Sequence, residues 1–567
     1  MMSEQLLERV RQWVEHDPDP ATRDELTELL NAAASGDEPA LAELDSRFSG
    51  PLVFGTAGLR AAVGAGESRM NCAVVIRASA GLASFLTERV GPAPLVVVGC
   101  DARHGSEDFA TDAAAVFSAA GCRAVRLPSR LPTPLVAYAV RQLGADAGVM
   151  VTASHNPPAD NGYKVYLGGR AVGSDDERGV QIVPPDDALI AEHIAAAPPA
   201  DRVPRDSSRV SAADADLVAG YIERAACLRD PEARSEISIA LTPMHGVGLD
   251  TALAVLRGAG FERVSVVAEQ AEPDPDFPTV AFPNPEEPGA MDLLVALAAG
   301  QDADVAIALD PDADRCAVAI PTGAGTGDPA RDWRRLSGDE LGALLGENAA
   351  ADPDRAGDTL ACSIVSGRLL GRIAEHHGLS FRQTLTGFKW IARTPGLRFG
   401  YEEAIGYCTD PSAVRDKDGI STAVRVASYV AALKDRGSTV QQELDRLAAM
   451  HGLWATAPLT FRVDDLSLIT RGLDRLRENP PREIAGSPVV EYTDLSKGGP
   501  EMLPTEGILI RTEADDRVIV RPSGTEPKLK CYLEVVLPVP EGGAVPREEA
   551  VARLARISEQ LREIVGL

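Results

Sequence analysis

The sequence predicts an α/β protein that is divided into several domains. Its 567 residues are enough for three or four domains, each with a core of its own. From Met70 to Met150, short apolar strands alternate with helical segments, which is the βαβ rhythm of a parallel or mixed sheet. The same rhythm restarts at Ile237 and continues to Leu309. A stretch rich in Pro and Asp at 184–212 lies between the two repeats and predicts a domain boundary.

Composition and charge narrow the class of protein. Apolar residues make up 45% of the chain and charged residues 25%, as in an ordinary soluble globular protein. The formal charge of −28 argues against nucleic acid or an anionic membrane surface as a partner. No apolar run approaches the roughly 20 residues of a membrane span, and the N-terminus lacks the features of a signal peptide. We therefore expect a cytoplasmic protein. The eight cysteines are scattered, which predicts neither a zinc site nor a disulfide framework.

The first segment, residues 1–48, is polar and prone to form helices. Leu6, Val10 and Val14 share one helical face. The Asp-Pro-Asp-Pro run at 17–20 interrupts this pattern before a second helix, predicted at Arg23–Ala34. We expect a helical arm without chemistry of its own.

Residues 49–212 are expected to form the first α/β domain. A glycine-rich loop, Phe54-Gly-Thr-Ala-Gly-Leu-Arg60, opens it and in isolation is a tight turn that ends in a cation. The elements predicted after this loop are a helix at 73–90, a strand at Leu95–Cys100, a helix at 107–120 and strands at Ala124–Leu127 and Ala147–Val151.

The turn that follows the last of these strands carries the first candidate for catalysis. Pro157 and Pro158 prevent a helix from starting at once, so Ser154 and His155 stand at the carboxyl end of a buried strand. Ligands of α/β proteins bind at that end. Lys164 follows ten positions after Ser154, close enough to return to the same site. The alternative is a hydrogen-bonded turn without catalysis.

In the second expected domain, residues 213–335, a strand at Val305–Leu309 runs into Asp310-Pro-Asp-Ala-Asp-Arg315. Three carboxylates at alternate positions suit a hard divalent cation such as Mg²⁺, because crowded anions need a counter-charge. An EF-hand, or a phosphatase with an aspartate nucleophile, would need other residue types at positions 313, 315 and 321. The remaining alternative is a solvated acidic turn.

The third expected domain, residues 336–456, carries loops suited to sugar hydroxyls. Sugar hydroxyls are commonly held by a carboxylate that accepts and a lysine that donates, and both residue types occur on these glycine-flanked loops. The loops are Thr386-Gly-Phe-Lys, Phe399-Gly-Tyr-Glu-Glu-Ala-Ile-Gly-Tyr and, after them, Arg415-Asp-Lys-Asp-Gly. Each loop by itself would be an ordinary surface loop.

The fourth expected domain, residues 457–567, contains a predicted phosphate-binding turn. A strand at Arg517–Val520 leads into Arg521-Pro-Ser-Gly-Thr-Glu-Pro527. Backbone N–H groups, two hydroxyls and flanking cations together suit a phosphate group. The alternative is a basic turn without a ligand.

These four motifs, in this order and spacing, resemble the α-D-phosphohexomutase superfamily from about residue 50 to the end. The loop at 54–60, the run Gly387-Phe-Lys-Trp-Ile and the Gly-Tyr-Glu-Glu form of the third loop are similar to the phosphoglucomutase and phosphopentomutase branch. That branch includes many bacterial chains labelled phosphomannomutase.

The resemblance implies an architecture and an activity. The implied fold has three related mixed α/β domains and a smaller C-terminal α+β domain around a central cleft. The implied enzyme is a phosphoglucomutase or phosphomannomutase, which interconverts a sugar 1-phosphate and a 6-phosphate through a phosphoserine and a bisphosphorylated sugar. Its expected cofactors are Mg²⁺ and a sugar bisphosphate activator of the glucose 1,6-bisphosphate type. The expected partner is a small phosphosugar, and the expected assembly is a monomer or weak dimer.

The resemblance also assigns roles to single residues. The implied catalytic residues are Ser154 as the phosphorylated nucleophile, Lys164 and Arg60 for proton transfer and charge stabilisation, and His155 beside the phosphate. The implied metal ligands are Ser154, through its phosphate, and Asp310, Asp312 and Asp314. The implied substrate-binding residues are Arg315, Lys389, Glu402, Ala404, Arg521, Ser523, Gly524 and Thr525.

The identity of the sugar stays open. Many hexose-specific relatives carry Glu-x-Ser at the third loop, whereas Glu402 is followed here by Glu403 and Ala404, which removes a hydroxyl donor. We rank glucose and mannose phosphates first and keep a phosphopentomutase acting on ribose or deoxyribose phosphates as the alternative. A non-catalytic phosphosugar-binding protein predicts a broken nucleophile or metal triad, and both are intact. A serine hydrolase predicts G-x-S-x-G, which the chain lacks.

Overall fold

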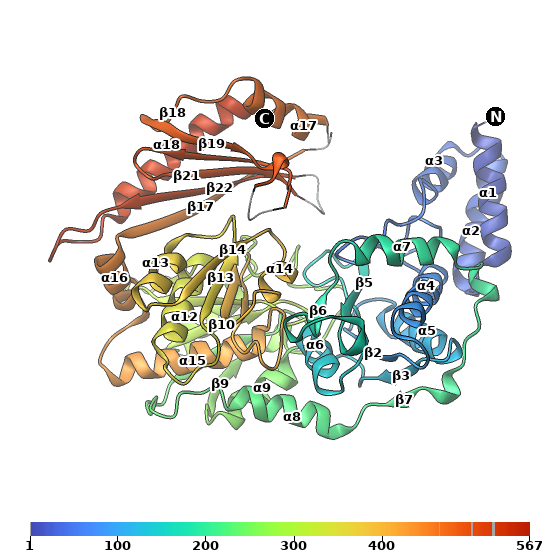
Figure 1. Ribbon diagram of the computed structural model, residues 1–567, viewed down its shortest axis with the longest axis horizontal. Helices are drawn as coiled ribbons and strands as arrows, with labels where there is room; N and C mark the ends of the chain where they lie inside the picture. The colour runs from blue at the N-terminus through green and yellow to red at the C-terminus, as the bar shows by residue number, and fades with distance from the viewer. Residues whose placement is uncertain (1, 464, 466, 500–502, 524–527, 567) are drawn as a thin grey trace. The chain divides into compact units, whose positions relative to one another are not determined.

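The computed structural model describes residues 2–463, 465, 467–499, 503–523 and 528–566 (Figure 1). The chain folds into two compact units. Unit 1 comprises Met1–Arg335 and Gly406–Ala432, and unit 2 comprises Leu336–Ile405 and Leu433–Leu567. The segment at 406–432, which the sequence associates with the third domain, therefore packs with unit 1. Within the described part of the chain, no helix combines the length and apolar character that a membrane crossing needs.

The N-terminal arm consists of α1 (Met2–His16), α2 (Pro20–Ala34) and α3 (Glu38–Arg47). Val10, Leu26, Leu44 and Phe48 are buried in a small core of their own. The third helix was not predicted from the sequence. Its start signal is nevertheless present, because Asp37 caps the helix by accepting a hydrogen bond from the N–H of Ala40.

The first sheet of unit 1 has the strand order β1-β5-β4-β2-β3-β7, with β6 paired to β5. The strands are β1 (Leu59–Ala62), β2 (Leu95–Cys100), β3 (Arg123–Arg126), β4 (Ala147–Val151), β5 (Asp160–Leu167), β6 (Val180–Gln181) and β7 (Ser211–Ala212). The helices are α4 (Cys72–Val90), α5 (Ser106–Ala119), α6 (Thr133–Gln142) and α7 (Asp186–Ala196). Strands β2, β3 and β4 are parallel, whereas β5 returns antiparallel to β4 with Lys164 opposite Met150. This return brings Lys164 beside the strand that leads to Ser154.

The second sheet of unit 1 has the order β12-β11-β10-β8-β9. Its strands are β8 (Ser238–Thr242), β9 (Arg263–Val266), β10 (Val305–Leu309), β11 (Cys316–Pro321) and β12 (Trp333–Arg335). The accompanying helices are α8 (Ala215–Ala226), α9 (Leu249–Gly258), α10 (Asp292–Gly300) and α11 (Pro329–Asp332). Strands β10 and β11 form an antiparallel hairpin with Leu309 opposite Cys316, so the three aspartates occupy its loop. Near the end of this loop, Arg315 forms a bridge with Gly406 of β16 (Gly406–Cys408), which precedes α15 (Gly419–Asp435).

Unit 2 contains a parallel arrangement in which β13 (Thr359–Ser363) pairs with both β14 (Ser380–Thr384) and β15 (Leu397–Glu402). The helices are α12 (Gly338–Ala351), α13 (Leu369–His376) and α14 (Phe388–Ala392). Lys389 lies in α14, and Glu402 is the last residue of β15. The predicted sugar-contacting residues therefore stand at or just after the carboxyl ends of parallel strands.

The second sheet of unit 2 is antiparallel, with the order β17-β22-β21-β20-β19-β18. Its strands are β17 (Leu453–Arg462), β18 (Glu483–Ile484), β19 (Ser487–Asp494), β20 (Ile508–Thr512), β21 (Arg517–Pro522) and β22 (Lys528–Leu537). Helix α16 (Val440–His451) precedes it, and α17 (Ser467–Glu478) and α18 (Arg547–Val565) lie together on one of its faces (Figure 1). Val518 and Val520 of β21 belong to the core under these helices, which leaves Arg517, Ile519 and Arg521 for the opposite face.

The predicted α/β class is confirmed, with mixed sheets followed by the antiparallel C-terminal sheet. The strands at Ala147–Val151 and Val305–Leu309 have the predicted bounds, and the other predicted strands of unit 1 differ by at most one residue at each end. These strands were predictable because they are short apolar runs bounded by turn residues.

Candidate active site

The Ser154 turn is held in a left-handed backbone conformation. Ser154 has a φ of 52° and is 3% exposed. Its N–H donates to the Oγ1 of Thr152 at 2.9 Å. A non-glycine residue in this conformation costs free energy, so the surrounding contacts must maintain it. The strained turn presents the Ser154 hydroxyl at the carboxyl end of β4.

Arg103 supplies the main contacts that maintain the turn. Its guanidinium donates to the backbone carbonyl oxygens of Ser154 and Asn156, each at 2.6 Å, of Pro157 at 2.8 Å and of Asp160 at 3.1 Å. The side chain is buried and also lies 4.9 Å from the ring centre of Phe277. The guanidinium of Arg103 thus binds four backbone carbonyl groups of one loop.

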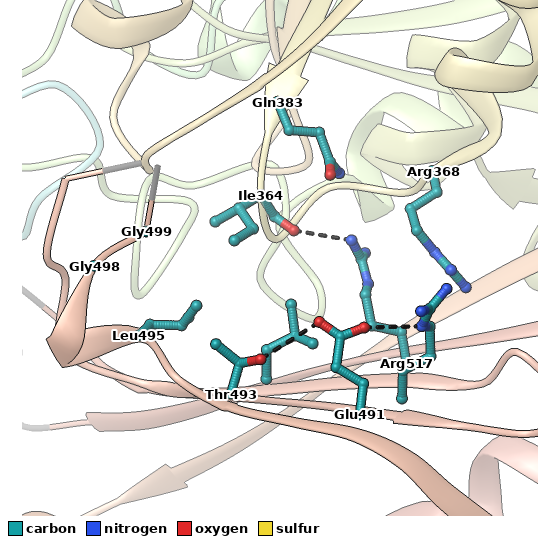
Figure 2. A pocket seen from close by; sticks show the side chains of 11 residues that line it. Ile364, Arg368, Gln383, Glu491, Thr493, Leu495, Gly498, Gly499 and Arg517 are labelled. Atoms are coloured by element: carbon teal, nitrogen blue, oxygen red, sulfur yellow. Dashed lines mark hydrogen bonds and ion pairs between the residues drawn. The ribbon is translucent and has the colours of Figure 1, made fainter. Parts of the chain in front are cut away.

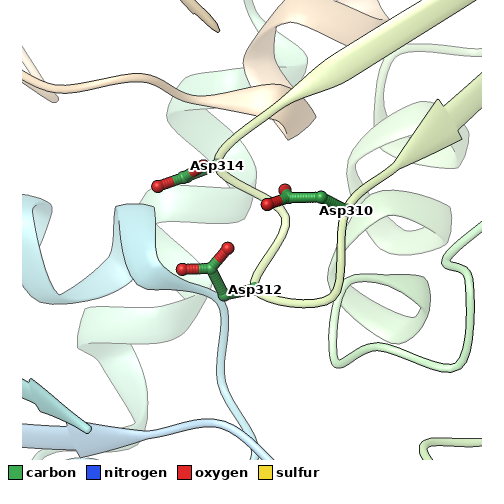
Figure 3. A group of neighbouring side chains, drawn as sticks. All are labelled: Asp310, Asp312 and Asp314. Carbon is green, nitrogen blue, oxygen red and sulfur yellow. The ribbon is translucent and has the colours of Figure 1, made fainter. Parts of the chain in front are cut away.

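The three aspartates of the β10–β11 loop converge, as Figure 3 shows. Asp310, Asp312 and Asp314 are at most 1% exposed, and one carboxylate oxygen from each lies within 4.8 Å of the others. The Ser154 hydroxyl donates to Asp310 Oδ2 at 2.8 Å. The nucleophile candidate and the predicted metal loop are therefore in direct contact, although they are 156 residues apart in the chain.

Two ammonium groups compensate part of this negative charge. Lys164 Nζ lies 2.8 Å from Asp312 Oδ2 and 3.2 Å from Asp314 Oδ2, and Lys417 Nζ lies 3.2 Å from Asp314 Oδ2. Burial alone lowers the pKa of the Lys164 ammonium, but the two aspartates outweigh burial and raise it. The pKa of Asp310 is raised well above its usual range by burial and by the neighbouring Asp312 and Asp314 carboxylates.

The chemistry of the aspartate loop fits a divalent cation. The Oδ1 atoms of Asp312 and Asp314 are buried and have no hydrogen-bond partner among the described residues. A buried carboxylate oxygen without a partner is costly in a closed protein. Hard cations such as Mg²⁺ take carboxylate oxygens as ligands. The two oxygen atoms that the protein leaves unsatisfied are thus of the type that such an ion needs.

Of the other predicted residues in unit 1, His155 places Nδ1 3.1 Å from the Ser154 hydroxyl oxygen. The pKa of its imidazole lies well below the usual value because the ring is buried and close to the cations of Arg315 and Arg60. Arg60 donates to the side-chain oxygen of Asn156 at 3.0 Å. Arg315 pairs with Glu286 and with Asp314, in each case at 3.8 Å. The predicted unit 1 residues are therefore grouped around one turn.

The group also contains three residues that the sequence does not place beside Ser154 or the aspartate loop. Thr133 donates its hydroxyl to Asp312 Oδ2 at 2.7 Å, Arg103 donates to the Ser154 turn, and Lys417 pairs with Asp314 of the aspartate loop. Arg103 and Thr133 follow β2 and β3, whose carboxyl ends share an edge with β4. Polar residues after each parallel strand were therefore a usable signal for these two. No comparable local signal marks Lys417.

Among the predicted residues of unit 2, Arg521 contacts the loop that leads to Lys389. Arg521 donates a hydrogen bond from Nη1 to Thr386 Oγ1, three residues before Lys389. Its Nε is buried and has no hydrogen-bond partner among the described residues. Ser523 follows β21, and Ala404 follows β15. Gly524 and Thr525, predicted to bind phosphate, lie outside the described residues.

Comparison with known proteins agrees with this arrangement. Domain models of the phosphoglucomutase/phosphomannomutase family match residues 51–196 (α/β/α domain I), 219–323 (domain II), 337–450 (domain III) and 462–552 (C-terminal domain). The chain is 42% identical over 498 residues to a probable phosphomannomutase of Haemophilus influenzae, covering 88% of this chain and 98% of that protein. It is 33% identical over 615 residues to the phosphopentomutase of Mus musculus, covering 100% and 94%.

Among solved structures, a putative phosphomannomutase from Thermus thermophilus matches with a TM-score of 0.69 and 25% identity, covering 91% of this chain and 99% of that one. The four domain models together span most of the sequence in the expected order. The chain therefore belongs to the phosphoglucomutase/phosphomannomutase family and is a phosphosugar mutase, an isomerase.

Proposed function

We propose that this mutase converts a sugar 1-phosphate into a 6-phosphate through a phosphorylated Ser154 and a bisphosphorylated sugar. The observation that carries the proposal is the 2.8 Å contact between the Ser154 hydroxyl and Asp310, beside two buried carboxylate oxygens that have no hydrogen-bond partner among the described residues. Phosphoryl transfer depends more on placement and charge neutralisation than on covalent participation by other groups. The strained turn places the serine, and the Lys164 ammonium together with a cation held by the aspartate loop would neutralise the charge.

In the first step, the phosphoryl group leaves Ser154 Oγ and bonds to the free hydroxyl oxygen of the sugar 1-phosphate, and the proton of that hydroxyl passes to Ser154 Oγ. In the second step, the phosphoryl group on O1 of the bisphosphate bonds to Ser154 Oγ, and the serine proton passes to O1, which leaves a sugar 6-phosphate. Lys164 and Arg60 are proposed to stabilise charge and transfer protons, with His155 beside the phosphate. Each of these residues contacts the Ser154 turn or the aspartate loop.

Asp310, Asp312 and Asp314 are proposed to hold Mg²⁺ together with the phosphate on Ser154. The two unsatisfied Oδ1 atoms support this assignment. When bound, the ion would neutralise charge on the transferred group. A sugar bisphosphate of the glucose 1,6-bisphosphate type is proposed as the activator, because it can phosphorylate Ser154 directly.

In unit 2, Glu402 and Lys389 are proposed to bind sugar hydroxyls, with Ala404 in the same loop. Arg521, Ser523, Gly524 and Thr525 are proposed to hold the phosphate that is not reacting, and Arg315 of unit 1 is proposed as a further substrate contact. The buried Nε of Arg521, which has no partner among the described residues, supports an oxyanion at that position.

The preferred sugar is proposed to be glucose or mannose. A pentose is the second candidate, because the chain matches a mouse phosphopentomutase over its whole length and carries Glu403-Ala404 after Glu402. The formal charge of −28 supports a small-molecule partner rather than nucleic acid, and we propose a cytoplasmic monomer or weak dimer.

The experiment measures kcat/KM for glucose, mannose and ribose 1-phosphate on one preparation, with Mg²⁺ and the matching bisphosphate. We expect the largest value for a hexose, and a loss of turnover when Mg²⁺ is chelated. A dominant ribose value would select the pentose alternative. Turnover that does not depend on Mg²⁺ would contradict the metal assignment, and intact mass without an added phosphate after bisphosphate treatment would contradict the phosphoserine.

A further inference from the structure

The sugar loop is attached to a single turn of unit 2, residues 363–366, which follows β13. Glu403, the neighbour of Glu402, accepts hydrogen bonds from the hydroxyls of Ser363 at 3.0 Å and Ser366 at 2.8 Å. The Glu403 N–H donates in return to Ser366 Oγ at 3.1 Å. The loop also packs closely against α12, because a Cβ added at Gly338 would lie 1.9 Å from the Glu403 carbonyl oxygen. The backbone that carries Glu402 is thus held from two sides.

The same turn is attached to strand β21. Arg517 donates from Nη1 to the carbonyl oxygen of Ile364 at 2.9 Å and from Nη2 to that of Ser366 at 2.7 Å. Figure 2 shows the Arg517 side chain reaching from its strand to the Ile364 carbonyl. Two residues along β21, Ile519 packs with Ile364 and Val365. One face of β21 therefore rests on this turn.

The charge of Arg517 is compensated inside the protein. Arg517 is 3% exposed, and its Nε lies 3.3 Å from Glu534 Oε2, on a residue that is 0% exposed and directly opposite on β22. The ion pair leaves the two Nη groups for the carbonyl oxygens of the turn. Lysine would keep the charge but lacks the planar fork that binds two acceptors at once. The contact therefore depends on arginine geometry as well as on charge.

The far end of β21 carries the proposed phosphate contact. Arg521 lies four residues beyond Arg517 on the same face of the strand and donates to Thr386, after β14. Glu402 and Arg521 are thus connected through one continuous series of contacts: the Glu403 carboxylate, the turn at 363–366, Arg517 and β21.

We infer that Glu403 and Arg517 are positioning residues, which set the spacing between the sugar contact Glu402 and the phosphate contact Arg521 and thereby the length of sugar phosphate that binds. A pentose 5-phosphate is one carbon shorter than a hexose 6-phosphate, so a fixed spacing discriminates between them. Small displacements of binding groups change ligand discrimination strongly. The inference rests on the proposed function of Glu402 and Arg521.

The test measures the dissociation constants of glucose 6-phosphate and ribose 5-phosphate by calorimetry on the full-length protein, for the wild type, Glu403→Gln, Arg517→Lys and the double variant. We expect each single variant to change the ratio of the two constants at least about fivefold. We expect the double variant to differ from the larger single effect by less than about twofold, because both changes release the same turn.

Arg511→Lys is the matched control. Arg511 lies in the neighbouring strand β20 and forms ion pairs with Glu491 at 3.0 Å and Asp515 at 3.9 Å, all within the six-stranded sheet and its turns. We expect it to keep the wild-type ratio. If both single variants keep the wild-type ratio of the two dissociation constants and only lower the melting temperature, Glu403 and Arg517 have a merely structural role. That result would overturn the inference. The inference would also be overturned if the fold-change of this ratio in the double variant equals the product of the fold-changes in the two single variants. Because binding is measured without turnover, absence of mutase activity would contradict only the proposed function.

Discussion

The two groups of predicted functional residues are held in different ways. In unit 1, the Ser154 turn and the aspartate loop contact one another directly through buried charged side chains, with Lys164 and Lys417 between the carboxylates. In unit 2, Glu402 and Arg521 are connected indirectly, through the turn at 363–366 and backbone carbonyl groups. The contacts of unit 1 thus mostly join charged side chains to one another, whereas those at the turn of unit 2 join charged side chains to hydroxyl and backbone groups.

This difference has an energetic consequence. Removing one partner of a buried ion pair leaves an uncompensated charge and costs roughly 3–5 kcal/mol. A hydrogen bond between a charged side chain and a neutral partner, as at the turn of unit 2, contributes about 1.5–3 kcal/mol. We therefore expect changes in unit 1 to lower kcat and the free energy of unfolding, whereas changes in unit 2 should act mainly on KM.

The largest effect is expected for Ser154→Ala. The substitution removes the atom that is proposed to carry the phosphoryl group, so turnover should fall by on the order of 10³-fold or more. The measurement is the mutase rate with saturating bisphosphate, together with intact mass. Full activity, or an added phosphate on the variant, would contradict the assignment of the nucleophile.

Lys164→Met should have the next largest effect. The methionine keeps most of the side-chain volume but leaves Asp312 and Asp314 without the ammonium that contacts both. We expect kcat to fall about 100-fold and the free energy of unfolding to drop by about 3 kcal/mol. Steady-state kinetics and urea unfolding measure the two quantities. A variant that changes only KM would place Lys164 with the recognition residues instead.

Arg103→Lys tests whether the strained Ser154 turn needs the two Nη groups of the Arg103 guanidinium. Lysine keeps the charge but cannot join four carbonyl groups, so we expect kcat to fall about 30-fold with little change in KM. Arg229→Lys is the matched control, since Arg229 also donates to two carbonyl oxygens, of Ala259 and Ala233, and lies 4.4 Å from the ring centre of Phe261. Equal losses in both variants would show that the effect is general to arginines that bind two or more carbonyl groups.

Arg521→Lys should separate recognition from chemistry. The change removes the buried Nε donor and the fork geometry while keeping a cation. We expect KM for the sugar phosphate to rise about tenfold and kcat to change by less than about threefold. A fall in kcat without a change in KM would contradict the role of unit 2 in holding the distant phosphate.

The smallest effect on activity is expected for Asp418→Asn. This substitution should instead change how the free energy of unfolding depends on pH. Burial raises the pKa of the Asp418 carboxyl group from 3.8 to about 6, against hydrogen bonds from Ser421 and Tyr221. Because the folded-state pKa is the higher one, the protonated form contributes stability below about pH 4. This contribution to the free energy of unfolding is on the order of 3 kcal/mol, and it is lost as the pH rises through 6. Urea unfolding between pH 4 and 7.5 measures it, and Asp418→Asn should flatten this dependence. An unchanged slope in that variant would assign the pH dependence to another group.

Much of the fold and most of the candidate site follow from local sequence. The strands before Ser154 and Asp310 are apolar runs, and each motif stands at a strand end where turn residues stop the regular structure. Helix α3, which the sequence prediction lacks, also has a local signal, because Asp37 and Pro39 mark its start. Capping residues of this kind predict where a helix begins.

The order of residues along the chain indicates which residue types follow which strands, and the order of the four motifs indicates the family. The pairing of Lys417 with Asp314, the contacts of Arg103 with the Ser154 turn, and the turn that Glu403 and Arg517 share follow from the three-dimensional fold. Local propensity and short motifs involve neighbours in the chain, which a sequence displays. These other contacts join residues dozens of positions apart, and they exist only because packed sheets and buried charges bring their partners together.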